Sequence, residues 1–340
     1  MYIMLSFLGF LASLVCAFIY GASFKELLFV PLSFGASFPT IFCMFTIAYL
    51  ALYVRAFYRR LKQGKSLKEA SEDVAQIVDS YLKSGRIVDS IPLFVAVMII
   101  MTTIPVMKSL IAYVHPYHLD IDFIKIDKWI HFGQYPQYLL APIIEKLGLI
   151  GLLNYSYNFW LGVMLGGYWY AIFIDRNEHR RLTFLWCSLI AWFGMGWGLA
   201  TSMSSVGPIF FGATFPEIPD PYAPYIEYLR GIHESGTMIS SLWVSDLLGQ
   251  MARDNNVIDL NGISAMPSMH VAIAALFAVY MWHVNKIWGV LYIVFAAIIM
   301  AGSIFLAWHY AIDGYFSIIC VLCLWYVTGF ILKKRKTAIE

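Results

Sequence analysis

Charged residues are scarce in this sequence. Asp, Glu, Lys and Arg occupy only 13% of the 340 positions, whereas hydrophobic residues occupy 60%. Soluble globular domains carry about 25% charged residues, so a water-soluble enzyme or binding domain is excluded. The mean hydropathy of +0.70 leads to the same conclusion.

Cysteine is also rare. The five cysteines all lie in apolar segments, and the CxxC formed by Cys320 and Cys323 has neither a second cysteine pair nor nearby histidines. Structural zinc sites need four such ligands, so we interpret these residues as small buried side chains. The N-terminal apolar run lacks a preceding basic region and a small-residue cleavage site, so we expect a retained helix rather than a signal peptide.

Long apolar runs are abundant instead. A helix needs about 20 apolar residues to cross a bilayer, and eight stretches meet this requirement. The sequence therefore predicts an all-α polytopic integral membrane protein with about eight transmembrane helices. The stretches are residues 2–20, 28–53, 91–112, 150–174, 182–201, 267–284, 287–306 and 314–332.

Lysine and arginine predict the orientation of these helices, because cytoplasmic loops are enriched in both residues. If the N-terminus is cytoplasmic, the cytoplasmic regions carry 16 of the 23 basic residues. We therefore expect both termini in the cytoplasm and two long outer loops, residues 113–149 and 202–266. The basic cytoplasmic regions are 54–90, 175–181, 285–286 and 333–340.

The two outer loops are too long to be simple connections. In the first, we expect Trp129, Phe132, Tyr135 and Tyr138 to form an aromatic belt on short interfacial helices. In the second, seven acidic residues stand against two basic ones, which is typical of a lid or binding element rather than a general phosphate-binding surface.

The first outer loop also concentrates histidines and acids. Their spacing matches no metal-binding motif, and we interpret them as solvated loop residues. They are His115, His118 and His131, with Asp120, Asp122 and Asp127.

The segment "SAMPSMH", residues 264–270, begins the sixth apolar stretch. Pro267 suits the first turn of a helix. Ser268 and the neighbouring backbone amides would then surround the helix N-terminus, where anions bind readily. His270 would lie one turn into the helix, at the outer face.

The segment "FLAWHYAIDGYF" ends the hairpin that follows. His309 and Asp313 are four residues apart and would share one helical face, so the carboxylate can hold one ring nitrogen and leave the other free. The topology brings His270 and His309 to the same side of the bilayer. Ionisable groups in membrane segments usually have a function, although an HxxxD pair can also be a purely structural hydrogen bond.

The motifs "PSMH" and "HYAIDG" resemble the second and third signature motifs of the type 2 phosphatidic acid phosphatase superfamily. Their form is most similar to the branch that contains fungal inositol phosphorylceramide synthase. The resemblance covers residues 264–316 and implies a catalytic six-helix core. We accordingly divide the chain into residues 1–90, with two transmembrane helices and a basic loop, and residues 91–340, the core.

The resemblance also implies a mechanism without metal or cofactor. His309 would attack a lipid phosphate ester to form a phosphohistidine, and Asp313 would orient it. His270 would protonate the leaving alcohol and then deprotonate the acceptor. The partners would be a phospholipid or other lipid phosphate, membrane lipids, and water, a small polyol or another lipid as acceptor; no nucleic acid is expected.

The sequence departs from the family where phosphatase-type members carry cations. Ser303 stands at the position of an arginine six residues before the nucleophile, which favours transfer of a phosphate-bearing headgroup over hydrolysis. Substrate-binding candidates are Ser268 and the replacement cations Lys108, Lys128 and Arg230 with His233. The segment "SSVGPIFFG", residues 204–212, either lines the pocket or only ends a helix.

Two alternatives use the same residues. A proton-coupled transporter would use His270, His309 and Asp313 as a relay, and an assembly subunit would keep the motifs without chemistry. The lack of long tails suits a bacterial inner membrane with a periplasmic active site, and a Golgi-type lumen is the alternative location.

Overall fold

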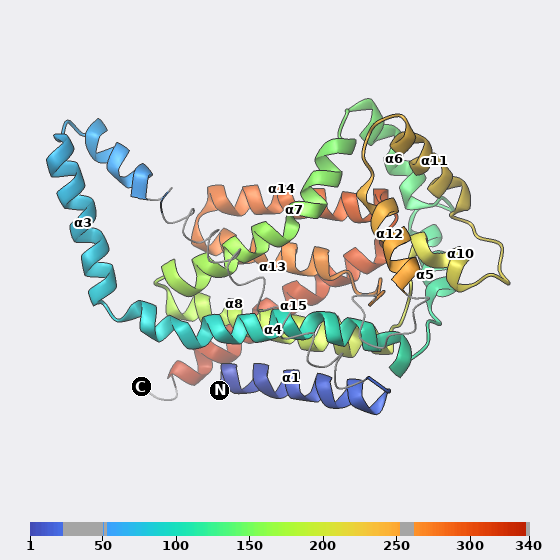
Figure 1. The fold of residues 1–340 in the computed structure, drawn as a ribbon, viewed down its shortest axis with the longest axis horizontal. Helices are drawn as coiled ribbons and strands as arrows, with labels where there is room; N and C mark the ends of the chain where they lie inside the picture. Colours follow the sequence, from blue (N-terminus) through green and yellow to red (C-terminus); the bar gives the residue numbers. More distant parts are fainter. Residues whose placement is uncertain (23–49, 51–52, 252–261, 338–340) are drawn as a thin grey trace.

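The computed structural model of the protein describes residues 1–22, 50, 53–251 and 262–337. These residues are predominantly helical and contain no strand, which confirms the all-α fold class. The long helices run along one axis and form an elongated bundle (Figure 1). The predicted stretch 28–53 lies almost wholly outside the described residues.

The other seven apolar stretches correspond to helices. Within the described residues, five helices are long and apolar enough to cross a membrane, and the bent pair Pro136–Lys146 and Ile150–Ile174 adds a sixth if it forms one span. The chain is therefore an integral membrane protein. The helices that correspond to the seven apolar stretches are α1 (Tyr2–Ile19), α4 (Arg86–Val114), α7 (Ile150–Trp169) with the π-helix η1 (Tyr170–Ile174), α8 (Glu178–Ile190) with the π-helix η2 (Ala191–Leu199), α13 (Met269–Val284), α14 (Lys286–Phe305) and α15 (Ala311–Thr337).

Helix α13 forms the centre of the bundle and packs against α14, α15, α7 and α8. Every residue from Val271 to Ala278 is buried. Several are alanines, and small side chains allow helices to approach closely within a membrane. A Cβ atom added at Gly167 of α7 would lie only 2.2 Å from the Phe277 ring. This tight packing holds the motif at the start of α13 in a defined position.

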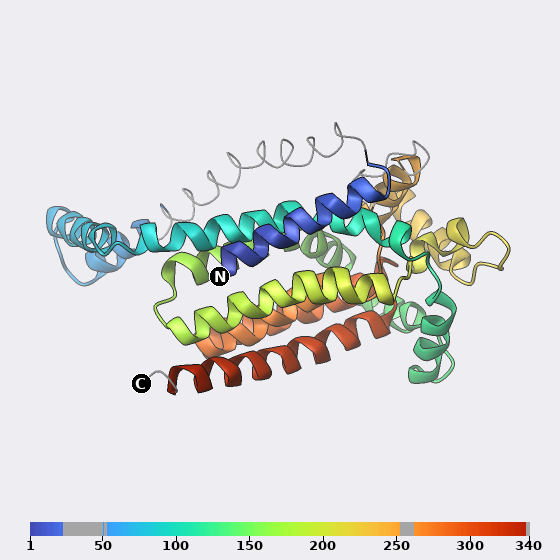
Figure 2. The same cartoon turned by 90° about the horizontal axis from the view of Figure 1, so that it is seen from below.

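Shorter helices gather at the end of the bundle where α4 ends, which we call the loop end (Figure 1). At the opposite end, helical residues 53–62 and α3 (Leu67–Lys83) project away from the bundle. Figure 2 shows α1 lying along α4. The loop-end helices are α5 (Asp120–Ile130), α6 (Pro136–Lys146), α10 (Phe211–Thr214), α11 (Ala223–Glu234) and α12 (Ser240–Met251).

The four aromatic residues expected to form an interfacial belt behave in two ways. Trp129 and Phe132 are 83% and 97% exposed. The rings of Tyr135 and Tyr138 instead pack edge-on against other tyrosines of the loop end, Tyr222 and Tyr225 respectively. The first pair is thus available to a lipid interface, whereas the second pair joins α6 to α11.

Candidate active site

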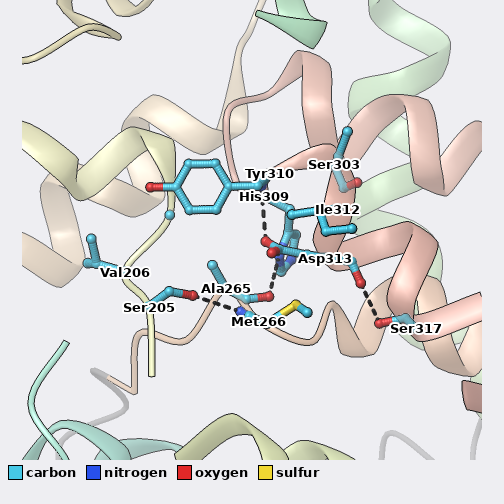
Figure 3. A network of polar contacts seen from close by, with 12 residues as sticks. Ser205, Val206, Ala265, Met266, Ser303, His309, Tyr310, Ile312, Asp313 and Ser317 are labelled. Carbon is cyan, nitrogen blue, oxygen red and sulfur yellow. Dashed lines mark hydrogen bonds and ion pairs between the residues drawn. The ribbon is translucent and has the colours of Figure 1, made fainter. Parts of the chain in front are cut away.

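The turn between α14 and α15 carries His309. The backbone N–H groups of Trp308 and His309 both donate to the carbonyl of Ser303, at 3.1 Å. Ala307 adopts a positive φ of 61°, which is uncommon for a residue other than glycine. The turn is therefore tightly wound, and it directs the His309 side chain toward the segment that precedes α13 (Figure 3).

One ring nitrogen of His309 is held by two acceptors. Its Nδ1 lies 2.8 Å from the carbonyl oxygen of Ala265 and 3.3 Å from Oδ2 of Asp313 (Figure 3). A carbonyl oxygen only accepts, so Nδ1 carries the proton and Nε2 keeps its lone pair. The Asp313 contact was expected from the sequence. The shorter contact, to a backbone carbonyl 44 residues away, was not.

Asp313 itself is fully buried. Its Oδ2 accepts a hydrogen bond from the Tyr310 N–H at 3.0 Å. The carboxylate therefore fixes both the backbone after His309 and the imidazole ring.

His270 is held by aromatic side chains of α7. Its ring stacks on Tyr157, with centroids 4.5 Å apart and an interplanar angle of 19°, and it also packs at 4.5 Å against Trp160. The indole N–H of Trp160 donates to the His270 carbonyl at 3.1 Å. The ring centroids of His270 and His309 are 6.2 Å apart, so the two motifs meet as the topology predicted.

The two histidines share a cavity of about 130 Å³. A bound water needs only about 10–15 Å³ of such space, so the cavity has room for a phosphate group. Its polar wall consists of Lys108, Ser264, His270 and His309, and Lys108 is the only Lys or Arg among the described residues that line it. The other lining residues are Ile104, Met107, Trp160, Trp192, Gly196, Ala200, Pro267 and Met269.

The remaining candidate cations lie elsewhere at the loop end. The Lys128 amine lies 4.8 Å above the Tyr135 ring. An Arg230 nitrogen lies 3.8 Å from a carboxylate oxygen of Asp246. His233 accepts a hydrogen bond from a backbone N–H in the following loop, at 3.1 Å. None of the three lines the cavity.

Ser268 is the N-cap residue of α13. It is fully buried, and its N–H lies 3.4 Å from the carbonyl oxygen of Asp313. Its hydroxyl has no hydrogen-bond partner among the described residues and does not belong to the cavity wall. The structure thus places Ser268 outside the cavity wall, where its backbone lies next to Asp313 of the second motif.

Residues 204–212, for which the sequence allowed two interpretations, form hydrogen bonds to the chain that precedes each of the two motifs. The Ser205 hydroxyl accepts from the Met266 N–H at 3.1 Å, and the Ser205 carbonyl accepts from the Ala265 N–H at 3.0 Å (Figure 3). Further along, the Ile209 N–H donates to the Ala307 carbonyl at 3.0 Å. This segment is therefore a scaffold that links the stretch before α13 to the turn after α14.

Gly207 has a specific role in this scaffold. Its φ and ψ of 86° and 166° lie in a region that is essentially restricted to glycine, and an added Cβ would lie 2.6 Å from the Trp308 carbonyl oxygen. We expect Gly207→Ala to lower the free energy of unfolding by at least about 2 kcal/mol. Thermal unfolding in detergent measures the effect.

The matched control is Gly231→Ala, in the last turn of α11, where an added Cβ meets nothing within 4 Å. Alanine is favoured over glycine in a helix by up to about 1 kcal/mol, so this variant should be as stable as the wild type or more so. Equal unfolding temperatures for Gly207→Ala and the wild type would contradict the expectation.

The expectation of solvated acids in the first outer loop is wrong for two of the three. Asp120 and Asp127 are 0% and 2% exposed, because each accepts hydrogen bonds from the backbone of the site. Burial raises the pKa of both carboxyls, and the hydrogen bonds from backbone N–H groups act in the opposite direction. Asp122 is exposed, as expected. Among the described residues, no group of three or more His, Cys, Asp or Glu could hold a metal ion.

Comparison with known proteins rests on one match. Neither the curated proteins nor the solved structures gave a match. A family model described as the PAP2 superfamily matches residues 121–327, more than half of the 340-residue chain. The matched span contains both motifs, the scaffold segment and α5 from its second residue onward. Together with the convergence of His270, His309 and Asp313 on one buried site, this match shows that the chain belongs to the PAP2 superfamily.

Proposed function

We propose that this protein transfers or hydrolyses a lipid phosphate ester through a phosphohistidine on His309. One observation carries the proposal: Nδ1 of His309 is held by Ala265 and Asp313, which leaves Nε2 as a nucleophile in a cavity shared with His270 and Lys108. In catalytic triads a carboxylate likewise holds one ring nitrogen of a histidine and leaves the other nitrogen free to react.

The reaction has two displacement steps. In the first, the lone pair of His309 Nε2 attacks phosphorus, the N–P bond forms, and the P–O bond to the leaving alcohol breaks. Protonated His270 gives its proton to the departing oxygen. In the second, His270 takes a proton from the acceptor hydroxyl, whose oxygen bonds to phosphorus as the N–P bond breaks. Water as acceptor gives hydrolysis, and an alcohol gives transfer.

Transfer to a polyol or lipid hydroxyl is the outcome that we favour. Ser303, which stands where phosphatase-type members carry an arginine, is buried, and its hydroxyl donates to the Met300 carbonyl at 2.8 Å. Lys108 from α4 is then the cation available to the phosphate. The motif form, similar to that of inositol phosphorylceramide synthase, supports the same choice. We place the site at the non-cytoplasmic face, which in a bacterial inner membrane is periplasmic.

The experiment that tests the proposal measures products. Detergent-purified protein is incubated with a panel of phospholipids and polyprenyl phosphates, with and without inositol or other polyols, and free phosphate and new headgroup-bearing lipids are quantified together. Acceptor-dependent lipid product supports transfer. Phosphate release that no acceptor changes contradicts transfer and leaves hydrolysis.

The role of Lys108 has its own prediction. Lys108→Met keeps an unbranched side chain that is only one atom shorter and removes the charge. Because a charge-assisted hydrogen bond contributes about 1.5–3 kcal/mol, we expect kcat/KM to fall about 10- to 100-fold. Steady-state kinetics on the active substrate measure the loss.

The matched control is Lys128→Met, which removes the same charge from a lysine outside the cavity wall. We expect its kcat/KM to stay within about twofold of the wild type. A larger loss of kcat/KM in Lys128→Met than in Lys108→Met would indicate that Lys128 of the first outer loop, and not Lys108, binds the phosphate.

A further inference from the structure

We propose that Asp120 and Asp127 of α5 are positioning residues that hold His309 in its reactive orientation. The inference rests on the proposed function, because it takes His309 as the nucleophile. Neither acid lines the cavity, so both would act through the backbone that carries the histidine.

Asp127 secures the chain directly after the nucleophile. Its Oδ2 accepts from the Ala311 N–H at 2.7 Å, and its Oδ1 accepts from the Ile312 N–H at 2.8 Å. These amides open α15, where the first N–H groups of a helix lack intrahelical partners. A capping acid normally comes from the residue just before the helix. Here it comes from a separate helix more than 180 residues earlier, which anchors the start of α15 to α5.

Asp120 contacts the scaffold segment and the residue that follows His309. Its carboxylate accepts from the backbone N–H groups of Val206 and Gly207, at 3.0–3.1 Å, and from the Tyr310 hydroxyl at 2.8 Å. Tyr310 directly follows the nucleophile, and Gly207 packs closely against the Trp308 carbonyl. The residues on both sides of His309 are therefore tied, directly or through the scaffold segment, to one carboxylate.

The cost of burying these carboxylates argues for a specific role. No described lysine, arginine or histidine forms an ion pair with either one. A buried carboxylate without a cation is expensive unless hydrogen bonds compensate it. Among the described residues, every donor to the two acids, apart from one tyrosine hydroxyl, is a backbone N–H of the scaffold segment, of the start of α15 or of α5 itself.

The geometry of α5 makes it suitable for this task. Asp120 and Asp127 are seven residues apart, two helical turns, and so lie on the same face of the helix. The face also buries Phe123, whose ring packs at 6.2 Å against Tyr310. One rigid helix thus spans the nucleophile turn, and misplacement of a reacting group by about 1 Å can reduce a rate about 100-fold.

The test substitutes Asp127 with asparagine in the full-length protein. Asparagine has one acceptor oxygen and one amide NH₂ group, so one of the two backbone N–H groups loses its acceptor. We expect kcat to fall about 10- to 100-fold with KM within about threefold of the wild type. Hydrogen–deuterium exchange of peptides covering residues 306–316 should accelerate at least about tenfold, while exchange in α4 stays unchanged.

Asp122→Asn is the matched control, because Asp122 lies on the exposed face of α5 and pairs with Lys125 at 3.1 Å. Tyr310→Phe is the second variant: it removes only the hydroxyl that reaches Asp120, and we expect a smaller loss of kcat with KM again preserved. This variant keeps the proposal testable if Asp127→Asn does not fold.

The values of kcat and KM and the hydrogen–deuterium exchange of residues 306–316 together test the positioning role. A lower kcat with faster local exchange and unchanged KM supports the positioning role. Unchanged exchange in residues 306–316 overturns the anchoring, and faster exchange with an unchanged kcat overturns its importance for His309. If His309→Ala keeps full activity, the proposed function fails instead. The exchange measurement then still reports whether the two acids hold the turn.

Discussion

Replacement of His309 with alanine is expected to reduce turnover at least about 1,000-fold while the protein remains folded. In the proposed mechanism the side chain provides the nucleophilic nitrogen, and removal of a covalent nucleophile commonly reduces the rate by several orders of magnitude. His270, with its ring centroid 6.2 Å away, is stacked on Tyr157 and is not placed to replace it. Product formation per mole of enzyme under saturating lipid measures the effect.

His179→Ala is the control for this variant. His179 is exposed near the start of α8, at the end of the bundle opposite the site, and its loss should leave turnover within about twofold. Retention of full activity in His309→Ala would contradict the phosphohistidine mechanism. If the wild type shows proton-coupled transport and no lipid chemistry, and His309→Ala loses that transport, the transporter alternative is favoured.

Replacement of His270 with alanine is expected to have an effect that depends on the leaving group. General acid–base catalysis contributes about 10²–10⁴-fold, so turnover of an alkyl phosphate ester should fall by that factor. Nitrophenolate departs without being protonated, so the first step should be largely preserved with a nitrophenyl ester. The second step still needs a base, and the phosphohistidine should therefore accumulate in this variant.

The accumulated intermediate can be measured directly. Phosphohistidine is stable in alkali and labile in acid, so radiolabel that stays on the protein in alkali and is released in acid identifies it. His283→Ala is the matched control, because His283 lies on the same helix as His270 but at its far, exposed end. Equal losses with both esters and no retained label would show that His270 does not act as the acid and base.

Much of the helical bundle and of the candidate site could be predicted from the sequence. Seven of the eight predicted apolar stretches correspond to helices of the described chain, because burial in lipid requires long apolar runs that are visible in any window. The pairing of His309 with Asp313 follows from a spacing of four residues on a helix. The meeting of His270 with His309 follows from topology, since a helical hairpin returns to the side where it began.

Other features had weaker signals in the sequence. Lys108 was one of several candidate cations, and nothing local separates it from Lys128 or Arg230. Tyr157 and Trp160 are three residues apart on α7 and hold His270, but aromatic residues are common in membrane helices. The acids of the first outer loop resemble solvated residues in composition, and only their burial shows otherwise.

By itself, then, the sequence determined the fold class, the two motifs and the identity of the three central residues. These depend on hydropathy and on spacing within one helix, which are local properties of the chain. Only the tertiary structure decided that the Ala265 carbonyl holds His309, that Lys108 lines the cavity, and that Asp120 and Asp127 face the backbone of the site. Those contacts join segments that lie far apart in the sequence, and they form only when the packed bundle brings the segments together.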